Sequence, residues 1–130
     1  MELTLVLDTN AYSDWRRSGR WHEWISIANR VVLPAVVLGE LYHGFRNGTK
    51  FEENVRKLSE LLKEPQVEII PVTIRTAEIY SEFLHFLQSE GTPIPTNDLW
   101  IAANAHECHG RLASRDEHFR LLPLVDIVEG

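Results

Sequence analysis

Short apolar runs separated by stretches with helical periodicity are the feature that most constrains the fold of this chain. Three such runs end at an acid or a proline: residues 3–7, 31–33 and 67–70. Runs this short and this rich in branched side chains are typical of strands buried on both faces of a parallel sheet. Residues 112–114 and 125–128 are weaker candidates for a fourth and a fifth strand.

The stretches between these runs carry the spacing of amphipathic helices. Residues 21–28 place apolar side chains at positions i, i+3, i+4 and i+7, which form one helix face. Thr49 with Glu52 predicts a capping box for one later helix, Thr73 predicts a cap for the next, and Thr96 or Asn97 predicts a cap for the last. Strands that alternate with helices predict an α/β fold around a mainly parallel sheet.

Length and composition favour a single domain, 1–130, with no repeat, linker or low-complexity segment. No run reaches the roughly eighteen apolar residues of a membrane span, and the first residues lack the pattern of a signal peptide. The single cysteine, Cys108, excludes an internal disulfide and a cysteine-based zinc cage. We therefore expect a cytoplasmic protein with no membrane partner.

The charge balance disfavours simple scaffolding of nucleic acid. The chain has 13 Lys and Arg against 19 Asp and Glu, a formal net charge of −6. A protein that holds phosphates by bulk electrostatics is usually basic. An acidic chain can still act on nucleic acid where carboxylates gather around a metal ion that reverses the local field. The positions of the acids are therefore more informative than the net charge.

Four acids lie where the chain leaves a predicted strand or enters a helix. Asp8 ends the first strand, and Asp116 follows the fourth. Asp98 opens a helix, and Glu40 lies near the second turn of the helix after the second strand. Each acid alone also suits a strand end, a helix start or a solvated face. Together they favour one pocket, because ligands gather at the carboxyl ends of parallel strands.

Acids that converge in this way require a cation. Two unit charges ~4 Å apart repel by about 4 kcal/mol at an effective dielectric constant of 20. Hard oxygen ligands select Mg²⁺ or Mn²⁺ over zinc, and such an ion supports hydrolysis of a phosphodiester. Asn10, Asn97 and Ser114 are neutral neighbours that suit either a turn or cap, or the orientation of a water or a ligand carboxylate.

Four segments in this order resemble a known family. They are LDTN at residues 7–10, GEL at 39–41, NDLWIA at 97–102 and SRDEHF at 114–119. The ordered set resembles the PIN-domain ribonucleases, and more closely the VapC-type toxins of bacterial toxin–antitoxin pairs. The resemblance implies a three-layer α/β/α sandwich with a mainly parallel five-stranded sheet.

The resemblance also implies an activity, a cofactor and partners. It implies an endoribonuclease dependent on Mg²⁺ or Mn²⁺, with Asp8, Glu40, Asp98 and Asp116 as the catalytic acids. Asp8, Asp98 and Asp116 would be the metal ligands, and Glu40 would act through a water. The implied partners are an RNA substrate and a cognate antitoxin that lies across the active-site groove. A homodimer or a toxin–antitoxin hetero-oligomer is the expected assembly.

One position departs from the pattern of some relatives. They carry a further acid two positions after the fourth acid, where this chain has His118. The departure leaves the number of metal ions open. For His118 itself, packing at a helix end is favoured over contact with a phosphate.

A basic and aromatic segment follows Asp8. Arg16, Arg17 and Arg20 lie among tryptophans, a composition that RNA-binding proteins use for phosphate contact and base stacking. Contacts with an acidic antitoxin are equally open. The alternative is that Trp21 belongs to the core and the arginines are solvated.

Other functions stay open as alternatives. An aspartyl-phosphate phosphatase or receiver-like domain would use Asp8 as the nucleophile, but it would need a late lysine, and none follows Lys63. A PIN-fold binding module without catalysis is a further alternative. His106 and His109 share a helix face, but a zinc site there is disfavoured because they lie at the far end of the helix that begins near Asp98.

Overall fold

The computed structural model describes residues 2–130, and in this part of the chain five strands form one parallel sheet. The strands are β1 (Thr4–Leu7), β2 (Arg30–Pro34), β3 (Val67–Ile70), β4 (Arg111–Ala113) and β5 (Asp126–Val128). Their order across the sheet is β3-β2-β1-β4-β5, and every neighbouring pair is parallel. The predicted α/β fold with five strands is confirmed.

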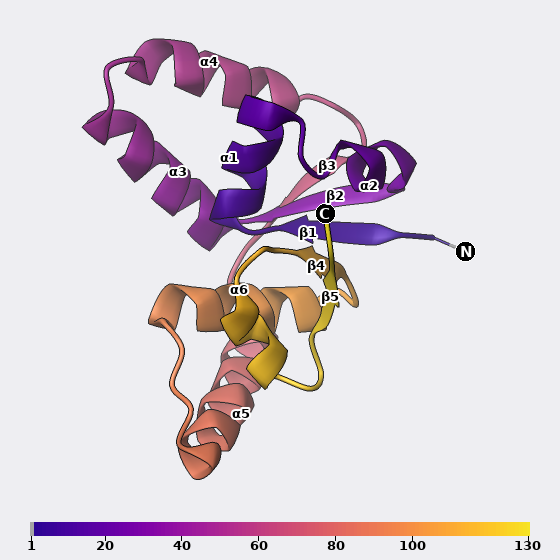
Figure 1. Ribbon diagram of the computed structural model, residues 1–130, viewed down its shortest axis with the longest axis vertical. Helices are drawn as coiled ribbons and strands as arrows, with labels where there is room; N and C mark the ends of the chain where they lie inside the picture. Colours follow the sequence, from indigo (N-terminus) through magenta and orange to yellow (C-terminus); the bar gives the residue numbers. More distant parts are fainter. Residues whose placement is uncertain (1) are drawn as a thin grey trace.

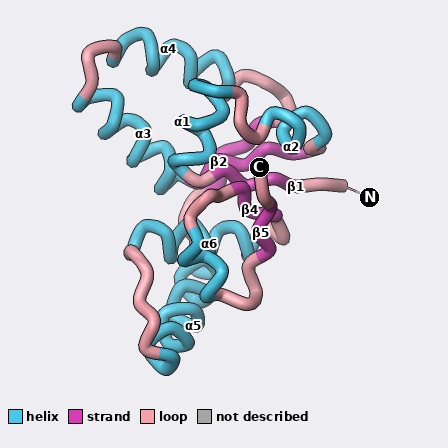
Figure 2. The backbone as a smooth tube through the Cα atoms, in the orientation of Figure 1, coloured by secondary structure: helices cyan, strands magenta, loops and turns pink. Residues whose placement is uncertain are grey.

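Helices cover both faces of this sheet. They are α1 (Thr9–Ser18), α2 (His22–Ile27), α3 (Ala35–Asn47), α4 (Phe51–Leu61), α5 (Ile74–Glu90), α6 (Thr96–Glu107) and a 3₁₀ helix, η1 (Glu117–Leu121). Figure 1 shows α1 to α4 on one side of the strands and α5 with α6 on the other, and Figure 2 shows the same layers by element type. Within residues 2–130, no helix combines the length and the apolar character needed to cross a membrane.

The strand order creates a crevice beside β1. The chain steps outward from β1 to β2 to β3, then returns past β1 to β4 and β5. Right-handed crossovers in opposite directions place their helices on opposite faces of the sheet, so the chain diverges between β1 and β4. Leu7 and Ala113 are partners in register at the ends of these two strands. Asp8 and Ser114 therefore follow side by side at the point where ligands bind in folds of this kind.

Burial explains why the strands are apolar on consecutive positions. Leu5, Val6 and Leu7 of β1 are completely buried, as are Val32 and Leu33 of β2. Both faces of these central strands lie under helices, so neither face tolerates a polar side chain. The edge strand β3 is only partly buried and accommodates an acid in its middle.

Two of the predicted helix caps are wrong. The cap of α4 is Lys50 rather than Thr49, because the first turn closes on the carbonyl of Lys50. Pro95 precedes α6, and Asn97 lies inside the first turn, where its side-chain amide donates to Glu40 instead of capping. The predicted cap at Thr73 is confirmed: its side chain accepts a hydrogen bond from the backbone of α5.

The core can be tested with two changes of the same type. Leu33→Ala removes a completely buried side chain and should lower the free energy of unfolding by about 2–5 kcal/mol. Leu124→Ala changes a leucine that is 62% exposed, and it should alter the free energy of unfolding by less than about 0.5 kcal/mol. Urea denaturation followed by circular dichroism measures both values, and equal losses would contradict this placement of the core.

Candidate active site

Asp8 is a buried carboxylate at the carboxyl end of β1. Its backbone is extended and its side chain caps α1, with Oδ1 accepting a hydrogen bond from the Ala11 N–H at 2.7 Å. Oδ2 accepts a second hydrogen bond from Ser114 Oγ at 2.5 Å. The residue is only 2% exposed. One aspartate therefore ends a strand, starts a helix and places a charge at the crevice.

Ser114 links the ends of β1 and β4. Its hydroxyl donates to Asp8 and accepts a hydrogen bond from the backbone N–H of Asp116 at 3.0 Å. The second contact fixes the turn between β4 and η1. Ser114 thus holds Asp8 and the backbone of Asp116 in one arrangement.

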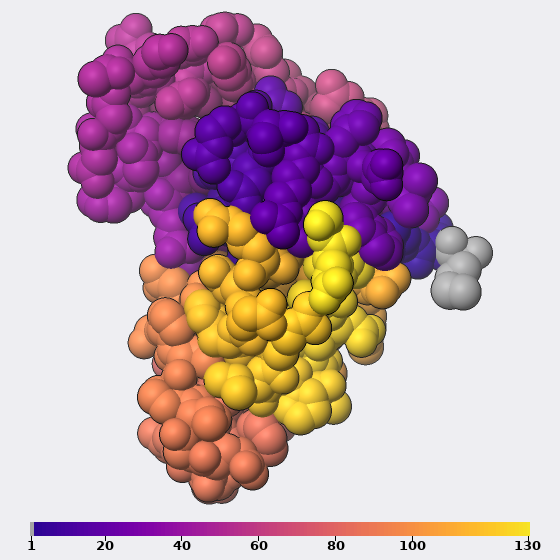
Figure 3. All heavy atoms as spheres, in the orientation of Figure 1, coloured from indigo at the N-terminus to yellow at the C-terminus, as the bar shows by residue number. Residues whose placement is uncertain are grey.

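Glu40 reaches the same region from the second turn of α3. It accepts hydrogen bonds from Thr9 Oγ1 at 2.5 Å and from Asn97 Nδ2 at 3.4 Å. Thr9 follows Asp8 and Asn97 precedes Asp98, so both contacts come from neighbours of the other acids. Glu40 also lines an open groove of about 540 Å³ between α3 and the start of α6. In Figure 3 the outline of the molecule is hollowed where the magenta atoms meet the orange ones.

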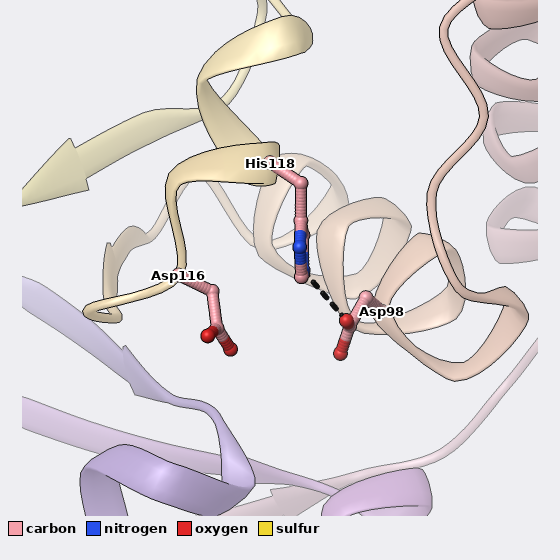
Figure 4. A group of neighbouring side chains, drawn as sticks. All are labelled: Asp98, Asp116 and His118. Carbon is pink, nitrogen blue, oxygen red and sulfur yellow. Dashed lines mark ion pairs between the residues drawn. The ribbon is translucent and has the colours of Figure 1, made fainter.

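Asp98 and Asp116 face each other across a small gap, together with His118. Asp98 lies in the first turn of α6, and its Oδ2 is 2.7 Å from His118 Nε2. One ligand atom from each of the three residues lies within 4.8 Å of the other two. Figure 4 shows the imidazole descending from η1 toward the space between the two carboxylates. The acids that were far apart in the sequence are therefore neighbours in space.

The acids also influence one another electrostatically. The pKa of Asp8 is raised from 3.8 to about 6. Burial is the main cause, the charges of Asp116 and Asp98 add to it, and the hydrogen bonds from Ser114 and Ala11 oppose it. Burial also raises the pKa of Asp98, opposed by His118 and supported by Asp116 and Glu40. The four carboxylates thus lie close enough for the charge of one to affect the ionisation of another. A cation between them would relieve both the desolvation and the repulsion.

The donor set fits a divalent metal ion. The carboxylates of Asp98 and Asp116 lie at ligand spacing from each other and from His118. Asp8 interacts electrostatically with both acids and is buried without a cationic partner among its contacts. Such oxygen donors suit a hard cation, which keeps waters and binds substrate phosphates. A metal-assisted attack on a phosphodiester is the chemistry that this arrangement best suits.

The three predicted arginines and Asn10 do not join this acidic group. Asn10 is exposed in the first turn of α1. Arg16 lies over the Trp15 ring at 4.9 Å, and Arg20 lies over the Trp21 ring at 5.2 Å. Trp21 is 3% exposed and belongs to the core, as the alternative interpretation held.

Arg16 and Arg17 line a second groove, between α1, α3 and α4. It has a volume of about 390 Å³, and its lining combines cations with aromatic and polar side chains: Tyr12, Ser13, Arg16, Arg17, Phe45, Asn54 and Lys57. Arg20 is not part of this lining. The groove is therefore basic, in contrast to the acidic group at the strand ends.

Several residues of the site were not identified from the sequence. Asp14 is buried and pairs with Arg115 at 2.8 Å and with Arg17 at 2.9 Å. Arg115 stands between Ser114 and Asp116, so this pair ties the turn after β4 to α1. Thr9 and His118 contact acids of the site directly. The signal for Thr9 and Arg115 was their proximity in sequence to Asp8 and Asp116. His118 was marked by the resemblance, as the position where some relatives carry a further acid, and Asp14 had no signal.

The histidines at the end of α6 serve other contacts. The His106 ring contacts the Leu124 carbonyl, and Glu107 accepts hydrogen bonds from Thr73 and Thr76. In residues 2–130, the only group of three side chains spaced to hold a metal ion is Asp98, Asp116 and His118. A zinc site at His106 and His109 therefore has no support.

The raised pKa of Asp8 predicts a pH-dependent loss of stability without metal. Between its unfolded value of 3.8 and its folded value of about 6, the folded state keeps a proton that the unfolded state releases. Folding is therefore penalised as pH rises through this window, by about 3 kcal/mol above it. Asp8→Asn removes the charge and keeps an oxygen that can accept from the Ala11 N–H, while its amide nitrogen can donate to Ser114 Oγ. The variant should therefore gain stability over the original protein at high pH.

Urea denaturation in EDTA at about pH 4.5 and about pH 7.5 measures this difference. The stability advantage of Asp8→Asn should grow by roughly 2–3 kcal/mol between the two pH values. An advantage that stays constant would show that Asp8 is not desolvated in the folded state.

Comparisons with known proteins agree with this geometry. Ribonuclease VapC5 of Mycobacterium tuberculosis is 29% identical over 117 residues, which cover 90% of this chain and 86% of that protein. The crystal structure of VapBC2 from Rickettsia felis bound to a DNA fragment from their promoter matches with a TM-score of 0.86 and 25% identity, covering 98% of this chain and 99% of the matched one. The structure of VapBC-5 from Mycobacterium tuberculosis, a member of the VapBC family of toxin-antitoxin systems, matches with a TM-score of 0.75 and 26% identity over 98% of both chains.

The family assignment follows from the length of the match. The PIN domain family model matches residues 5–123, from the first residues of β1 to the turn before β5, and so includes all four acids. The resemblance on which the sequence-based expectations depended is thereby confirmed. The chain belongs to the PIN domain family.

Proposed function

We propose that this chain is a divalent-metal-dependent endoribonuclease, the toxin of a type II toxin–antitoxin system, acting as a single PIN-like domain. The observation that carries the proposal is the pairing of Asp98 and Asp116 at ligand spacing, with Asp8 and Glu40 close enough to influence their charges. Two relatives that carry the name ribonuclease, and that this chain matches over most of their length, support the same activity. RNA would be the substrate, and the cytoplasm would be the place of action.

Asp8, Asp98 and Asp116 would hold the metal ion, Mg²⁺ or Mn²⁺. When bound, such an ion activates a water and offsets the charge that develops during phosphodiester hydrolysis. Ser114 would keep Asp8 and the backbone of Asp116 in register through its two hydrogen bonds. The pair of Arg115 and Asp14 would hold the same turn from its other side.

Glu40 would act on the substrate side of the site. Thr9 and Asn97 hold its two carboxylate oxygens, and the groove it lines is open to solvent. A carboxylate held in this way can orient a water and accept its proton as the phosphodiester is attacked. Asn97 positions Glu40, and Asn10, which is exposed nearby on α1, would contact the RNA or a water.

The cognate antitoxin would lie across the active-site groove and extend into the basic groove between α1, α3 and α4. Arg16 and Arg17 give it a positive charge within an acidic protein, which suits an acidic or mixed peptide segment. Arg20, at the end of the same segment, would extend this contact or meet the RNA. Relatives of known structure assemble as VapBC toxin–antitoxin complexes. A homodimer or a toxin–antitoxin hetero-oligomer would be the working assembly.

The activity is tested with purified protein freed of antitoxin and incubated with total RNA. Cleavage into discrete fragments should require Mg²⁺ or Mn²⁺ and should stop on addition of EDTA. Asp98→Asn should lower the rate at least about a hundredfold, because it removes a charged ligand. Asp126→Asn, the same change at an exposed acid of β5, should leave the rate unchanged.

Two results would contradict the proposal. Cleavage that survives Asp98→Asn would place the catalytic centre elsewhere or reveal a contaminating nuclease. No cleavage of several RNA classes by folded protein with either ion would favour a PIN-fold binding module.

A further inference from the structure

His118 lies beside the acids Asp98 and Asp116, whereas the sequence favoured only a packing role for it at a helix end. It lies in the first part of η1, two residues after Asp116, and its Nε2 is 2.7 Å from Asp98 Oδ2. Its side chain is 30% exposed, but the Nε2 atom itself is buried. Figure 4 shows the ring directed toward the gap between the two aspartates.

The contact between His118 and Asp98 is close but not aligned as a hydrogen bond. Nε2 has no hydrogen-bond partner in the described part of the chain, although a carboxylate oxygen lies 2.7 Å away. A buried polar nitrogen without a hydrogen bond is costly and calls for another partner. A metal ion bound between the nitrogen and the oxygen would supply that partner.

The distances suit a single ion. Two ligand atoms each about 2.1 Å from an octahedral ion are roughly 3.0 Å apart when adjacent and about 4.2 Å apart when opposite. The separation of 2.7 Å between Nε2 and Oδ2 is close to the first value. The three donors of Asp98, Asp116 and His118 all lie within 4.8 Å of one another, a spacing at which one ion can be held between them.

Packing fixes the direction of the imidazole. Phe119, the next residue of η1, is completely buried, and its ring lies 5.0 Å from the His118 ring at an angle of 53°. The buried phenylalanine anchors η1 against the core and so holds the histidine over the site. Packing at a helix end, favoured for His118 from the sequence, is therefore present, and it presents the ring to the acids.

We propose that His118 is a nitrogen ligand of the metal centre, and that it makes the centre select Mn²⁺ over Mg²⁺. The inference rests on the proposed function for the existence of the centre, and it adds the ligand and the selectivity. Mg²⁺ prefers an all-oxygen shell, whereas affinity for imidazole nitrogen rises along the first-row transition metals. Where an acid would complete a site for Mg²⁺, the histidine favours a softer ion.

Binding of the metal alone tests the proposal without any RNA. Isothermal titration of the full chain with Mn²⁺ and with Mg²⁺ should show Mn²⁺ binding at least about tenfold more tightly. His118→Gln should weaken Mn²⁺ binding at least about tenfold and Mg²⁺ binding much less. His118→Asp should narrow the preference for Mn²⁺ by restoring an oxygen donor. His85→Gln, at an exposed histidine of α5, is the matched control and should change neither affinity.

Electron spin echo spectroscopy of the bound Mn²⁺ gives a direct readout of the ligand. The original protein and His85→Gln should show the coupling of an imidazole nitrogen, which should change frequency on labelling histidine with ¹⁵N. The coupling should be absent from His118→Gln. This measurement on the unmodified chain decides the question even if a variant fails to fold.

The possible outcomes distinguish the role of His118 as a metal ligand from the proposed ribonuclease activity. Mn²⁺ bound without nitrogen coupling, or with equal affinity in His118→Gln, overturns the inference while leaving an all-carboxylate nuclease centre intact. Nitrogen coupling in a protein that cleaves no RNA supports the inference and contradicts the proposed function. A chain that binds no Mn²⁺ contradicts both.

Discussion

The hydrogen bond from Ser114 Oγ to Asp8 Oδ2 joins the two strand ends on which the rest of the site depends. β1 and β4 are neighbours in the sheet, but the chain between them passes through two strands and six helices. The paired register of Leu7 and Ala113 brings their next residues together, and the serine then fixes both Asp8 and the turn that carries Asp116. Burying Asp8 there raises its pKa, and the proposed metal ion would offset that cost.

The same geometry suits the proposed action of an acidic protein on a polyanion. With a net charge of −6, the chain as a whole would repel RNA, and several of its acids lie close together at the candidate site. A divalent ion held there reverses the local charge and becomes the point at which a phosphate can bind. Affinity for the substrate and the chemistry of cleavage would then depend on the same ion, which makes the ligand set decisive for both.

Much of this structure follows from local sequence, and the exceptions have physical reasons. The strands at residues 3–7 and 31–33 were predictable because central strands of a parallel sheet must be apolar on both faces. Asp8 and Asp116 could be singled out because Asp8 directly follows β1 and Asp116 lies in the turn after β4, and the carboxyl ends of these strands share an edge. The caps of α4 and α6 were not, because Asn97 is used by Glu40, a residue fifty-seven positions away.

The contacts that complete the site depend on long-range geometry. Asp14 meets Arg115 only after β4 has paired with β1, and no local pattern marks the pair. The role of His118 was missed for a related reason: a histidine beside a phenylalanine at a helix end suits packing, and its approach to Asp98 depends on where α6 begins. Local sequence therefore marks the positions of the acids, whereas the contacts of those acids depend on the tertiary structure.

The most direct test of the account is a crystal soaked in Mn²⁺ and measured at the manganese absorption edge. The account predicts an anomalous peak between β1, β4 and the start of α6, within coordination distance of carboxylate oxygens from Asp8, Asp98 and Asp116. A map with no peak there, or with manganese only at surface acids elsewhere, would contradict the claim that these carboxylates form one metal centre.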